Sequence, residues 1–385
     1  MKYIEEFRAR DLAVHIAAAI AREAEPARTY QFMEFCGGHT HAIFRYGVQD
    51  LMPANVKFLH GPGCPVCILP TRRLDDAIEL AEQHNVILCS YGDMMRVPGT
   101  KRRSLLRARA EGADVRMVYS MLDALEIART HPEREVVFLA VGFETTAPAT
   151  AQAIATAAHE GLTNFSVFSN HVLTPAAIRH LLEALGVDEA QAARIDGFLG
   201  PSHVSTIIGA RPYEFLAERY RKPVVIAGFE PLDVMQSVLM LIRQVNDGRV
   251  MVENEYARAV TSEGNTKAQA LVERIFVRRH AFEWRGLGVV PDSALAIRPA
   301  YGAFDAERRF TLSPKQTSEA KSCECPSILR GVKKPADCKL FGNGCTPDNP
   351  VGSCMVSSEG ACAAYWTYRR VETLAEIARN RSQVA

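Results

Sequence analysis

A chain of 385 residues is long enough for two or three domains of ordinary size. Its 48% hydrophobic and 23% charged residues are typical of a globular protein with sizeable cores, and a net charge of +1 argues against a general nucleic-acid binder. No apolar run reaches the roughly 18 residues that cross a bilayer, and the N-terminus lacks the features of a signal peptide. We therefore expect a cytoplasmic protein without a membrane or nucleic-acid partner.

The first predicted element is an amphipathic helix over residues 5–24, where Leu12, Ile16 and Ile20 recur at helical spacing. From residue 29, short apolar runs alternate with helical stretches, which is typical of a mostly parallel sheet. The expected strands are residues 30–35, 55–60, 86–90 and 115–119, and the expected helices are residues 71–84 and 101–111.

The alternation restarts after a polar run near residues 130–135. Here we expect strands at residues 135–141, 165–168, 195–199 and 223–227, with helices at residues 147–159, 175–185, 213–220 and 232–245. Beyond residue 248 we expect a helix at residues 267–278 and an irregular Gly- and Pro-rich stretch over residues 285–302. The predicted domains are an N-terminal helix packed on the rest (1–28), two α/β domains (29–131 and 132–248) and a C-terminal domain (249–385).

The ten cysteines are distributed unevenly along the chain. Four lie in the first quarter (Cys36, Cys64, Cys67 and Cys89), and six lie within forty residues near the C-terminus (Cys323, Cys325, Cys338, Cys345, Cys354 and Cys362). In a reducing compartment, such clusters hold metals or perform redox chemistry more often than they form a disulfide framework.

The sequence Cys-Gly-Gly-His-Thr-His begins at Cys36, directly after a predicted strand. Ligands bind at the carboxyl edge of a parallel sheet. Because two glycines follow Cys36, its sulfur and the nearby backbone N–H groups can approach a ligand closely. A helix that begins near His39 would favour the thiolate of Cys36 through its dipole, and His39 and His41 add titratable groups. The alternative is a buried structural cysteine in a tight turn.

A Cys-x-x-Cys pair, Cys64 and Cys67, follows the next predicted strand. Such a pair is half of a zinc site, a dithiol/disulfide pair, or two ligands of a shared metal. Together with Cys36 it gives three soft ligands, which suit iron or thiol redox chemistry. Cys89, within a predicted strand, is most simply a buried apolar side chain.

The six C-terminal cysteines are enough for a [4Fe–4S] cubane, which needs four thiolates, and they leave two that could form an exchangeable dithiol. Spacing alone supports a Cys₄ zinc site equally well. Because Gly and Pro are frequent over residues 331–352, this segment needs a metal or a cluster to order it.

Four segments together resemble the HypD family of [NiFe]-hydrogenase maturation factors: residues 35–41, 61–67, 142–146 and 354–362. The resemblance covers nearly the whole chain. It implies an α/β fold with two Rossmann-like parallel-sheet domains plus a loop-rich iron–sulfur domain. The family's cluster spacing, with gaps of fourteen, six and sixteen residues, falls on Cys323, Cys338, Cys345 and Cys362. Cys325 and Cys354 remain as a pair that in the family can form a redox-active disulfide.

The same resemblance implies a scaffold on which, with the small partner HypC, a mononuclear iron acquires two cyanides and one carbon monoxide. HypE delivers the cyanide, and the hydrogenase large-subunit precursor is an indirect partner. Cys36 would be the principal iron ligand, with Cys64 and Cys67 as further ligands or a redox switch. For hydrogen bonding or proton transfer near the iron, the candidates are His39, His203 and Glu359. A cluster-dependent thiol–disulfide oxidoreductase and a zinc-stabilised binding protein remain as alternatives.

Overall fold

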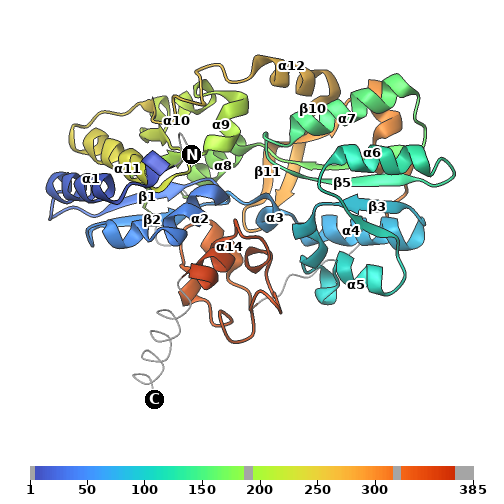
Figure 1. Ribbon diagram of the computed structural model, residues 1–385, viewed down its shortest axis with the longest axis horizontal. Coiled ribbons are helices and arrows are strands. Elements are labelled where there is room, and N and C mark those ends of the chain that lie inside the picture. The colour runs from blue at the N-terminus through green and yellow to red at the C-terminus, as the bar shows by residue number, and fades with distance from the viewer. Residues whose placement is uncertain (1–4, 186–193, 315–321, 369–385) are drawn as a thin grey trace.

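The computed structural model describes residues 5–185, 194–314 and 322–368 (Figure 1). Residues 1–4 and 369–385, which belong to the first and last predicted domains, lie outside the described residues. Two parallel sheets form the framework, with the strand orders β2-β1-β7-β8-β9 (sheet A) and β4-β3-β5-β6 (sheet B). The predicted fold class, α/β with two parallel sheets and a loop-rich C-terminal region, is confirmed.

Sheet A lies in one lobe of the molecule (Figure 1, left). Its strands are β1 (Tyr30–Glu34), β2 (Val56–His60), β7 (Gly197–Gly200), β8 (Val224–Ile226) and β9 (Val252–Asn254). The helices of this lobe are α1 (Arg10–Glu23), α2 (Gly37–Arg45), α9 (Ser202–Ile208), α10 (Glu214–Glu218) and α11 (Pro231–Asn246). The apolar face of α1 packs on α11, so the predicted N-terminal helix is present and covers this lobe.

Sheet B lies in the other lobe and consists of β3 (Ile87–Ser90), β4 (Val115–Met117), β5 (Val136–Gly142) and β6 (Phe165–His171). Every residue of β5 and β6 is buried, as expected for parallel strands covered on both faces. Helices α6 (Met121–Thr130) and α7 (Ala147–Glu160) lie on one side, and α4 (Thr71–Gln83) and α5 (Leu105–Ala110) on the other (Figure 1).

The two sheets do not follow one another along the chain. The first two strands belong to sheet A, the next four to sheet B, and the following three return to sheet A. The boundary predicted near residue 131 therefore does not separate the sheets, since β4 and β5 lie on either side of it within sheet B. Periodicity along the chain reports strands and helices, but it does not report which strands pair.

One sequence prediction is wrong in the region after α12 (Thr266–Ile275). The stretch over residues 285–302, expected to be irregular, contributes to a long antiparallel hairpin of β10 (Phe276–Trp284) and β11 (Gly288–Ile297). The register shifts where Arg279 and Ala281 face Ala294 and Pro291, so one extra residue of β11 disturbs the alternation that would have marked a strand. Gly286 and Gly288 both take positive φ angles, as the turn requires.

The predicted helix over residues 101–111 begins later than expected. Ser104 accepts the backbone N–H of Arg107 at 3.2 Å, and this N-cap starts α5 at Leu105. The remaining helices are α3 (Pro65–Ile68), α8 (Thr174–Leu185), α13 (Ala306–Arg309) and α14 (Cys325–Leu329). The 3₁₀ turns are η1 (Glu5–Arg8), η2 (Val48–Leu51), η3 (Gly92–Arg96), η4 (Thr100–Arg102), η5 (Arg211–Tyr213), η6 (Pro299–Phe304), η7 (Pro335–Asp337) and η8 (Ser353–Met355).

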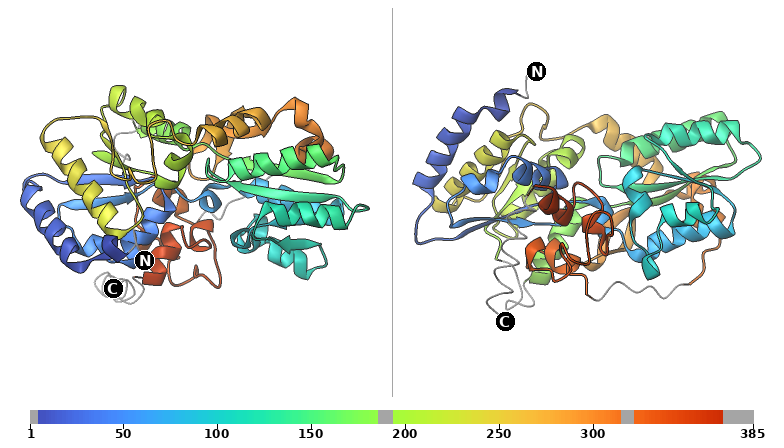
Figure 2. Two further views of the ribbon diagram at one scale, coloured as in Figure 1. Left: turned by 45° about the horizontal axis from the view of Figure 1, so that its top comes forward. Right: turned by 60° about the horizontal axis from the view of Figure 1, so that its bottom comes forward.

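Residues 322–368, called here the cysteine-rich segment, lie against both lobes (Figure 2). The ring of Tyr365 packs on Phe44 of α2, and Arg96 of η3 donates to the carbonyl of Pro347 at 3.1 Å. Apart from α14, η7, η8 and the helical residues 361–368, this segment consists of turns, loops and isolated bridges, and it is loop-rich as predicted.

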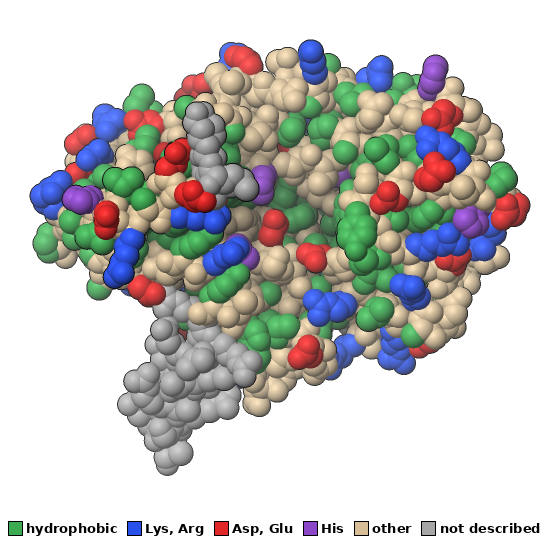
Figure 3. Space-filling view, viewed as in Figure 1, with side chains coloured by type: hydrophobic (Ala, Val, Ile, Leu, Met, Phe, Trp, Pro, Cys, Tyr) green, Lys and Arg blue, Asp and Glu red, His purple; other side chains and the backbone are tan. Residues whose placement is uncertain are grey.

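The described surface agrees with the nearly balanced charge. On the face drawn in Figure 3, Lys and Arg side chains stand among Asp and Glu side chains. Within residues 5–185, 194–314 and 322–368, no helix combines the length and the apolar character that crossing a membrane requires.

Candidate functional site

Cys36 lies at the carboxyl edge of sheet A, where the strand order reverses. β1 ends at Glu34, Cys36 follows in an extended conformation, and α2 begins at Gly37. The chain connects β1 to its neighbour β2 on one side of the sheet and β7 to its neighbour β8 on the other. Ligands of parallel sheets bind outside the carboxyl ends of the strands at such a reversal. The geometry therefore favours a functional cysteine over a structural one.

The side chain of Cys36 is nearly buried, with 6% of its surface exposed. Burial, followed by the negative charge of Glu359, raises the pKa of Cys36 to about 12. The backbone N–H groups of Gly38 and His39 lower this pKa, as predicted for the start of a helix, but burial outweighs them. Cys36 is thus a neutral thiol at pH 7 and must lose a proton to bind a metal ion.

Glu34, which the sequence analysis did not single out, holds the loop after β1 in place. Its carboxylate is fully buried and accepts the backbone N–H of Cys36 at 3.0 Å. It also accepts the hydroxyl of Thr40 and Nδ1–H of His60, the latter at 2.9 Å. Because a buried charge is costly unless it is hydrogen-bonded, these bonds fix the loop to β2. An acidic residue at the end of an apolar strand is the signal that could have revealed it.

Two glycines allow the loops around Cys36 to approach closely. A Cβ at Gly63 would stand 2.5 Å from the backbone nitrogen of Cys36, and a Cβ at Gly37 would stand 2.4 Å from the Cβ of Glu359. Gly37 also donates its N–H to the carbonyl of Gly63 at 3.0 Å. The loops after β1 and β2 and the turn that carries Glu359 therefore meet at Cys36.

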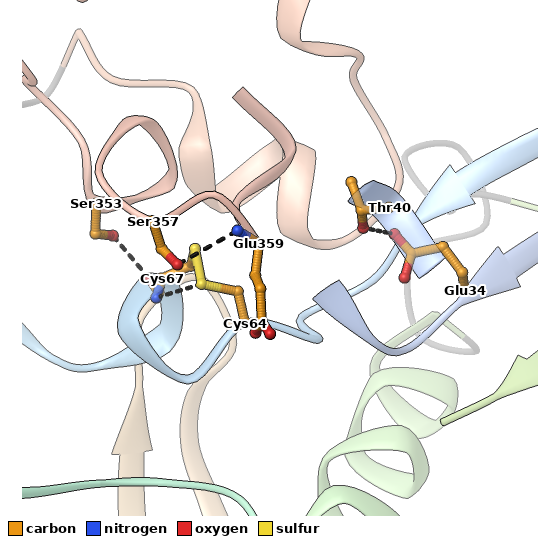
Figure 4. The surroundings of a disulfide bond; sticks show 7 residues. All are labelled: Glu34, Thr40, Cys64, Cys67, Ser353, Ser357 and Glu359. Atoms are coloured by element: carbon orange, nitrogen blue, oxygen red, sulfur yellow. Dashed lines mark hydrogen bonds between the residues drawn. A yellow bond between two sulfur atoms is a disulfide. The ribbon is translucent and has the colours of Figure 1, made fainter. Parts of the chain in front are cut away.

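Cys64 and Cys67, on the loop after β2, are joined by a disulfide. The Sγ of Cys64 also accepts the N–H of Cys67 at 3.2 Å, and both residues are buried. The Oγ of Ser353 donates to the carbonyl of Cys67 at 2.9 Å, and Figure 4 shows Ser353 and Glu359 beside the pair. Of the alternatives from the sequence, the structure shows the disulfide form, in which neither sulfur is a thiolate. We call the loops that carry Cys36, Cys64 and Cys67 the front sulfur site.

His203, at the start of α9, faces Cys36 across the strand-order reversal. Its Nδ1 lies 4.0 Å from the Sγ of Cys36, and its ring lies 3.8 Å from that of Phe229, centroid to centroid. Burial lowers the pKa of His203 to about 4, so the imidazole is neutral at pH 7. The structure thus places His203 next to Cys36, and its role in hydrogen bonding or proton transfer stays a prediction.

His39 is buried in α2. Its Nε2 lies 3.1 Å from the Oγ of Ser202 and 3.0 Å from the carbonyl of Ala227, so it ties α2 to the ends of β7 and β8. His41 lies 3.3 Å from the hydroxyl of Tyr368 in the cysteine-rich segment. The contacts of His39 thus indicate a positioning role.

Glu359 is half-buried, and its backbone carbonyl and side chain lie against Gly37, the residue after Cys36. Burial, and next the negative charges of Asp93 and Glu34, raise the pKa of Glu359. Its own charge in turn raises the pKa of Cys36. Glu359 is therefore a carboxyl group suited to hold a proton near the sulfur.

Five of the six C-terminal cysteines line one small cavity, whose walls are otherwise apolar: Cys323, Cys325, Cys338, Cys345 and Cys362, with Ile328, Leu340, Phe341 and Met355. All four cysteines predicted to bind a cluster are in this set. The sulfur of Cys325 is central, since a hydrogen-bonding contact with it raises the pKa of both Cys323 and Cys362. Cys354 is fully buried in η8, and the negative charge of its thiolate form raises the pKa of Cys362.

The donors around this cavity fit an iron–sulfur cluster in number and chemistry, because at least four soft thiols face one apolar space. Within the described residues, no three His, Cys, Asp or Glu side chains surround a single metal position. A Cys₄ zinc site also takes four thiolates, so metal and sulfide analysis distinguishes the two.

The disulfide that the family resemblance implies between Cys325 and Cys354 is not formed, because both carry free thiols. Its formation stays a prediction. Cys89 is fully buried within β3, as predicted for an apolar side chain.

The chain is similar over nearly its full length to known proteins. The family model HypD, described as "Hydrogenase formation hypA family", matches residues 11–369. The hydrogenase maturation factor HypD of Rhizobium leguminosarum bv. viciae is 63% identical over 370 residues, which cover 96% of this chain and 96% of that protein. The protein of the same name from Cupriavidus necator is 60% identical, covering 98% of this chain and 100% of its own. That from Escherichia coli is 45% identical, covering 97% and 100%. The chain therefore belongs to the HypD family of hydrogenase maturation factors.

Proposed function

We propose that this protein is an iron–sulfur scaffold in [NiFe]-hydrogenase maturation. On it, with a HypC-like small partner, a single iron acquires two cyanides and one carbon monoxide. A HypE-like partner delivers the cyanide, and the hydrogenase large-subunit precursor receives the product indirectly. The iron and its diatomic ligands are the cargo of the site. The observation that carries the proposal is a buried Cys36 at the strand-order reversal, on a loop fixed by Glu34 and Gly63.

Cys36 is the proposed protein ligand of the iron. An electron-rich thiolate is a suitable anchor for ferrous iron that also carries cyanide and carbon monoxide. Because the pKa of Cys36 is about 12, binding of the iron has to displace a proton. Nδ1 of His203 can relay this proton but not keep it, since its pKa is about 4. The carboxyl group of Glu359, whose pKa is raised by burial, is better suited to hold it.

The Cys64–Cys67 disulfide provides a switch at the same edge of the sheet. Its reduction would add two thiolates to the front sulfur site, whereas oxidation leaves Cys36 as the one free thiol of the three. Ser353, which donates to Cys67, is next to Cys354 in η8, so one short helix contacts both groups of cysteines. This contiguity supports a functional link between them.

Cys323, Cys338, Cys345 and Cys362 are the proposed ligands of a [4Fe–4S] cluster, which would supply one-electron transfer when bound. Cys325 and Cys354 are the proposed exchangeable pair beside it. Eight of the ten cysteines are free thiols, which supports a reducing compartment such as the cytoplasm.

The decisive experiment is infrared spectroscopy of the protein purified anaerobically with its small partner from cells that make active hydrogenase. We expect cyanide and carbonyl stretching bands. The variant Cys36→Ala should lose these bands together with the iron that binds at the front sulfur site, called here the front iron. Cys89→Ala, which changes a buried cysteine of β3, is the matched control and should keep the bands. Repeated absence of the bands from the unmodified complex would refute the proposal.

A second candidate function is a cluster-dependent thiol–disulfide oxidoreductase, which the Cys64–Cys67 disulfide favours. The same Cys36→Ala variant separates the two functions. An oxidoreductase should keep its dithiol turnover without Cys36, whereas the scaffold should lose bound iron. Metal and sulfide analysis tests the zinc alternative, since one zinc per chain without inorganic sulfide would exclude the cluster.

A further inference from the structure

A cavity of about 220 Å³ adjoins the cysteine-rich segment and has no role in the proposed chemistry at Cys36. Cys323, Cys325 and Gly352 form one part of its wall, and three basic residues form another: Lys101, Arg102 and Arg285. Among the described residues that line it, none is acidic. The cavity therefore places concentrated positive charge beside two thiols.

Arg285 is fixed within the cavity wall. The residue is buried, with 7% of its surface exposed, and one of its guanidinium N–H groups donates to the hydroxyl of Thr71 at 2.7 Å. Its backbone N–H donates to the carbonyl of Ile68, one residue after Cys67, at 2.8 Å. A buried guanidinium is well suited to pair with a carboxylate, because the charge is less screened than at the surface.

Lys101 and Arg102 are exposed and have an unusual backbone conformation. Both have φ angles in the left-handed region, 53° and 60°, although neither is glycine. Two consecutive residues of this kind are costly and are most often found where a site needs them. Arg102 also donates to the side chain of Asn349 and, at 3.5 Å, to the carbonyl of Pro350. These bonds hold the basic turn against the cysteine-rich segment.

Gly352 leaves the two sulfurs open to the cavity. A Cβ at this position would stand 2.5 Å from the Sγ of Cys323 and 2.5 Å from the Sγ of Cys325. Any larger residue would cover both sulfurs. The absence of a side chain at Gly352 and the basic residues opposite are thus two independent features of one site.

We propose that this cavity binds a small thiol that carries at least one carboxylate, and that the bound thiol exchanges with Cys325. The carboxylate pairs with Arg285 and the basic turn, and the sulfur lies against Cys325. A simple inorganic anion would use the cations but not the thiols. The inference rests on the proposed function in one respect, since it takes Cys325 to lie outside the cluster.

The exchange balances in atoms and electrons. When Cys325 is oxidised in a protein disulfide, the thiolate of the bound molecule attacks it, the protein S–S bond breaks and a mixed disulfide with Cys325 forms. The released protein thiolate takes up the proton that the small thiol lost. A second small thiol then frees Cys325 as a thiol and leaves as the symmetrical disulfide. Two small thiols are oxidised, and one protein disulfide gains two electrons and two protons.

The test uses the reverse reaction on the full-length protein, in which Cys325 is a free thiol. The protein is treated with an aromatic disulfide that carries carboxylates or with neutral dipyridyl disulfide, and labelling of Cys325 is followed by peptide mass spectrometry. Each rate is divided by that of an unstructured cysteine peptide. We expect the anionic probe to be favoured at Cys325 by about tenfold, and about 0.5 M salt to weaken this preference.

The variant Lys101→Glu/Arg102→Glu should abolish the preference for the anionic probe. The matched control Lys57→Glu/Lys267→Glu makes the same change in net charge at exposed sites in β2 and α12 and should keep it. Gly352→Ala should slow both probes equally, because it covers the sulfurs.

An equal relative rate for the two probes, a preference that survives the Lys101/Arg102 reversal, or labelling of Cys323 in place of Cys325 would each overturn the inference. Iron and inorganic sulfide are measured on the same anaerobic preparation. Their absence would count against the proposed function, whereas the probe ratio at Cys325 decides the anionic-thiol site in either case.

Discussion

The two sulfur-bearing regions of this molecule are held in place by different means. The front sulfur site is fixed by the ends of parallel strands, by backbone hydrogen bonds between loops and by the buried carboxylate of Glu34. The cysteine-rich segment has the short helix α14, two 3₁₀ turns, helical residues at 361–368 and several glycines and prolines in its described part. The front sulfur site is therefore shaped before it receives cargo, whereas the order of the cysteine-rich segment depends on what its thiols bind.

The largest effect is expected from Cys362→Ser. This change removes a predicted cluster ligand, and structural metal sites contribute on the order of 10 kcal/mol to the folding of small loop-rich units. We expect loss of iron and inorganic sulfide, together with loss of amide hydrogen-exchange protection over residues 322–368. Protection in β5 and β6 should not change. The control Cys89→Ala should keep the iron and sulfide. If residues 322–368 remained fully protected without metal, the order of the cysteine-rich segment would not depend on what its thiols bind.

Gly63→Ala tests the opposite region. The added methyl group would stand 2.5 Å from the backbone nitrogen of Cys36, so the loop after β2 must move. We expect the free energy of unfolding to fall by roughly 2–4 kcal/mol in urea titrations, with loss of the front iron but not of inorganic sulfide. In Gly344→Ala the new Cβ meets only Leu340, at 3.6 Å, and the variant should resemble the parent protein. Equal losses of stability and of iron in the two variants would show that the front sulfur site does not depend on the close contact at Gly63.

The sequence predicted β1 to β8 and the loops that carry the cysteines, because apolar runs and turn residues are local signals. It did not predict β9, which is short and only partly buried. It did not predict which strands pair, since the return of β7 to β1 is a contact between distant segments. The role of Glu34 was missed for the same reason, because His60 and Thr40 become its partners only when β1 and β2 are adjacent.

The cysteine positions alone also left the grouping of the C-terminal thiols open. Five of them face one cavity because α14 and the turns after it fold back on Met355, which no spacing rule states. The family resemblance supplied the ligand assignment, and that assignment stays a prediction.

A pH titration of stability tests a buried carboxyl group at the edge of sheet B, in the regular part of the molecule. Burial raises the pKa of Glu144, at the end of β5, to about 7, although it accepts two hydrogen bonds from Thr174. In an unstructured chain the pKa is about 4.3. Between these values the unfolded chain loses the proton and the folded protein keeps it, so this group makes the free energy of unfolding fall as the pH rises.

The variant Glu144→Gln should remove this dependence. The difference in unfolding free energy between variant and parent should change in favour of the variant by roughly 3 kcal/mol between about pH 4 and pH 7. Glu133→Gln, at an exposed position, should give a difference that is flat with pH. A flat difference for Glu144→Gln as well would mean that the carboxyl group is ionised when folded.

The smallest effect is expected from Glu34→Gln. The amide replaces one acceptor oxygen by a donor group, so one of the three hydrogen bonds from Cys36, Thr40 and His60 is lost. We expect a loss of about 1–2 kcal/mol in unfolding free energy and faster alkylation of Cys36 by iodoacetamide, because the loop after β1 is less firmly held. Glu283→Gln, an exposed change in β10, should alter neither measurement. If alkylation of Cys36 were unchanged while stability fell, Glu34 would stabilise the sheet without positioning the thiol, and the front sulfur site would owe its shape to the glycine contacts alone.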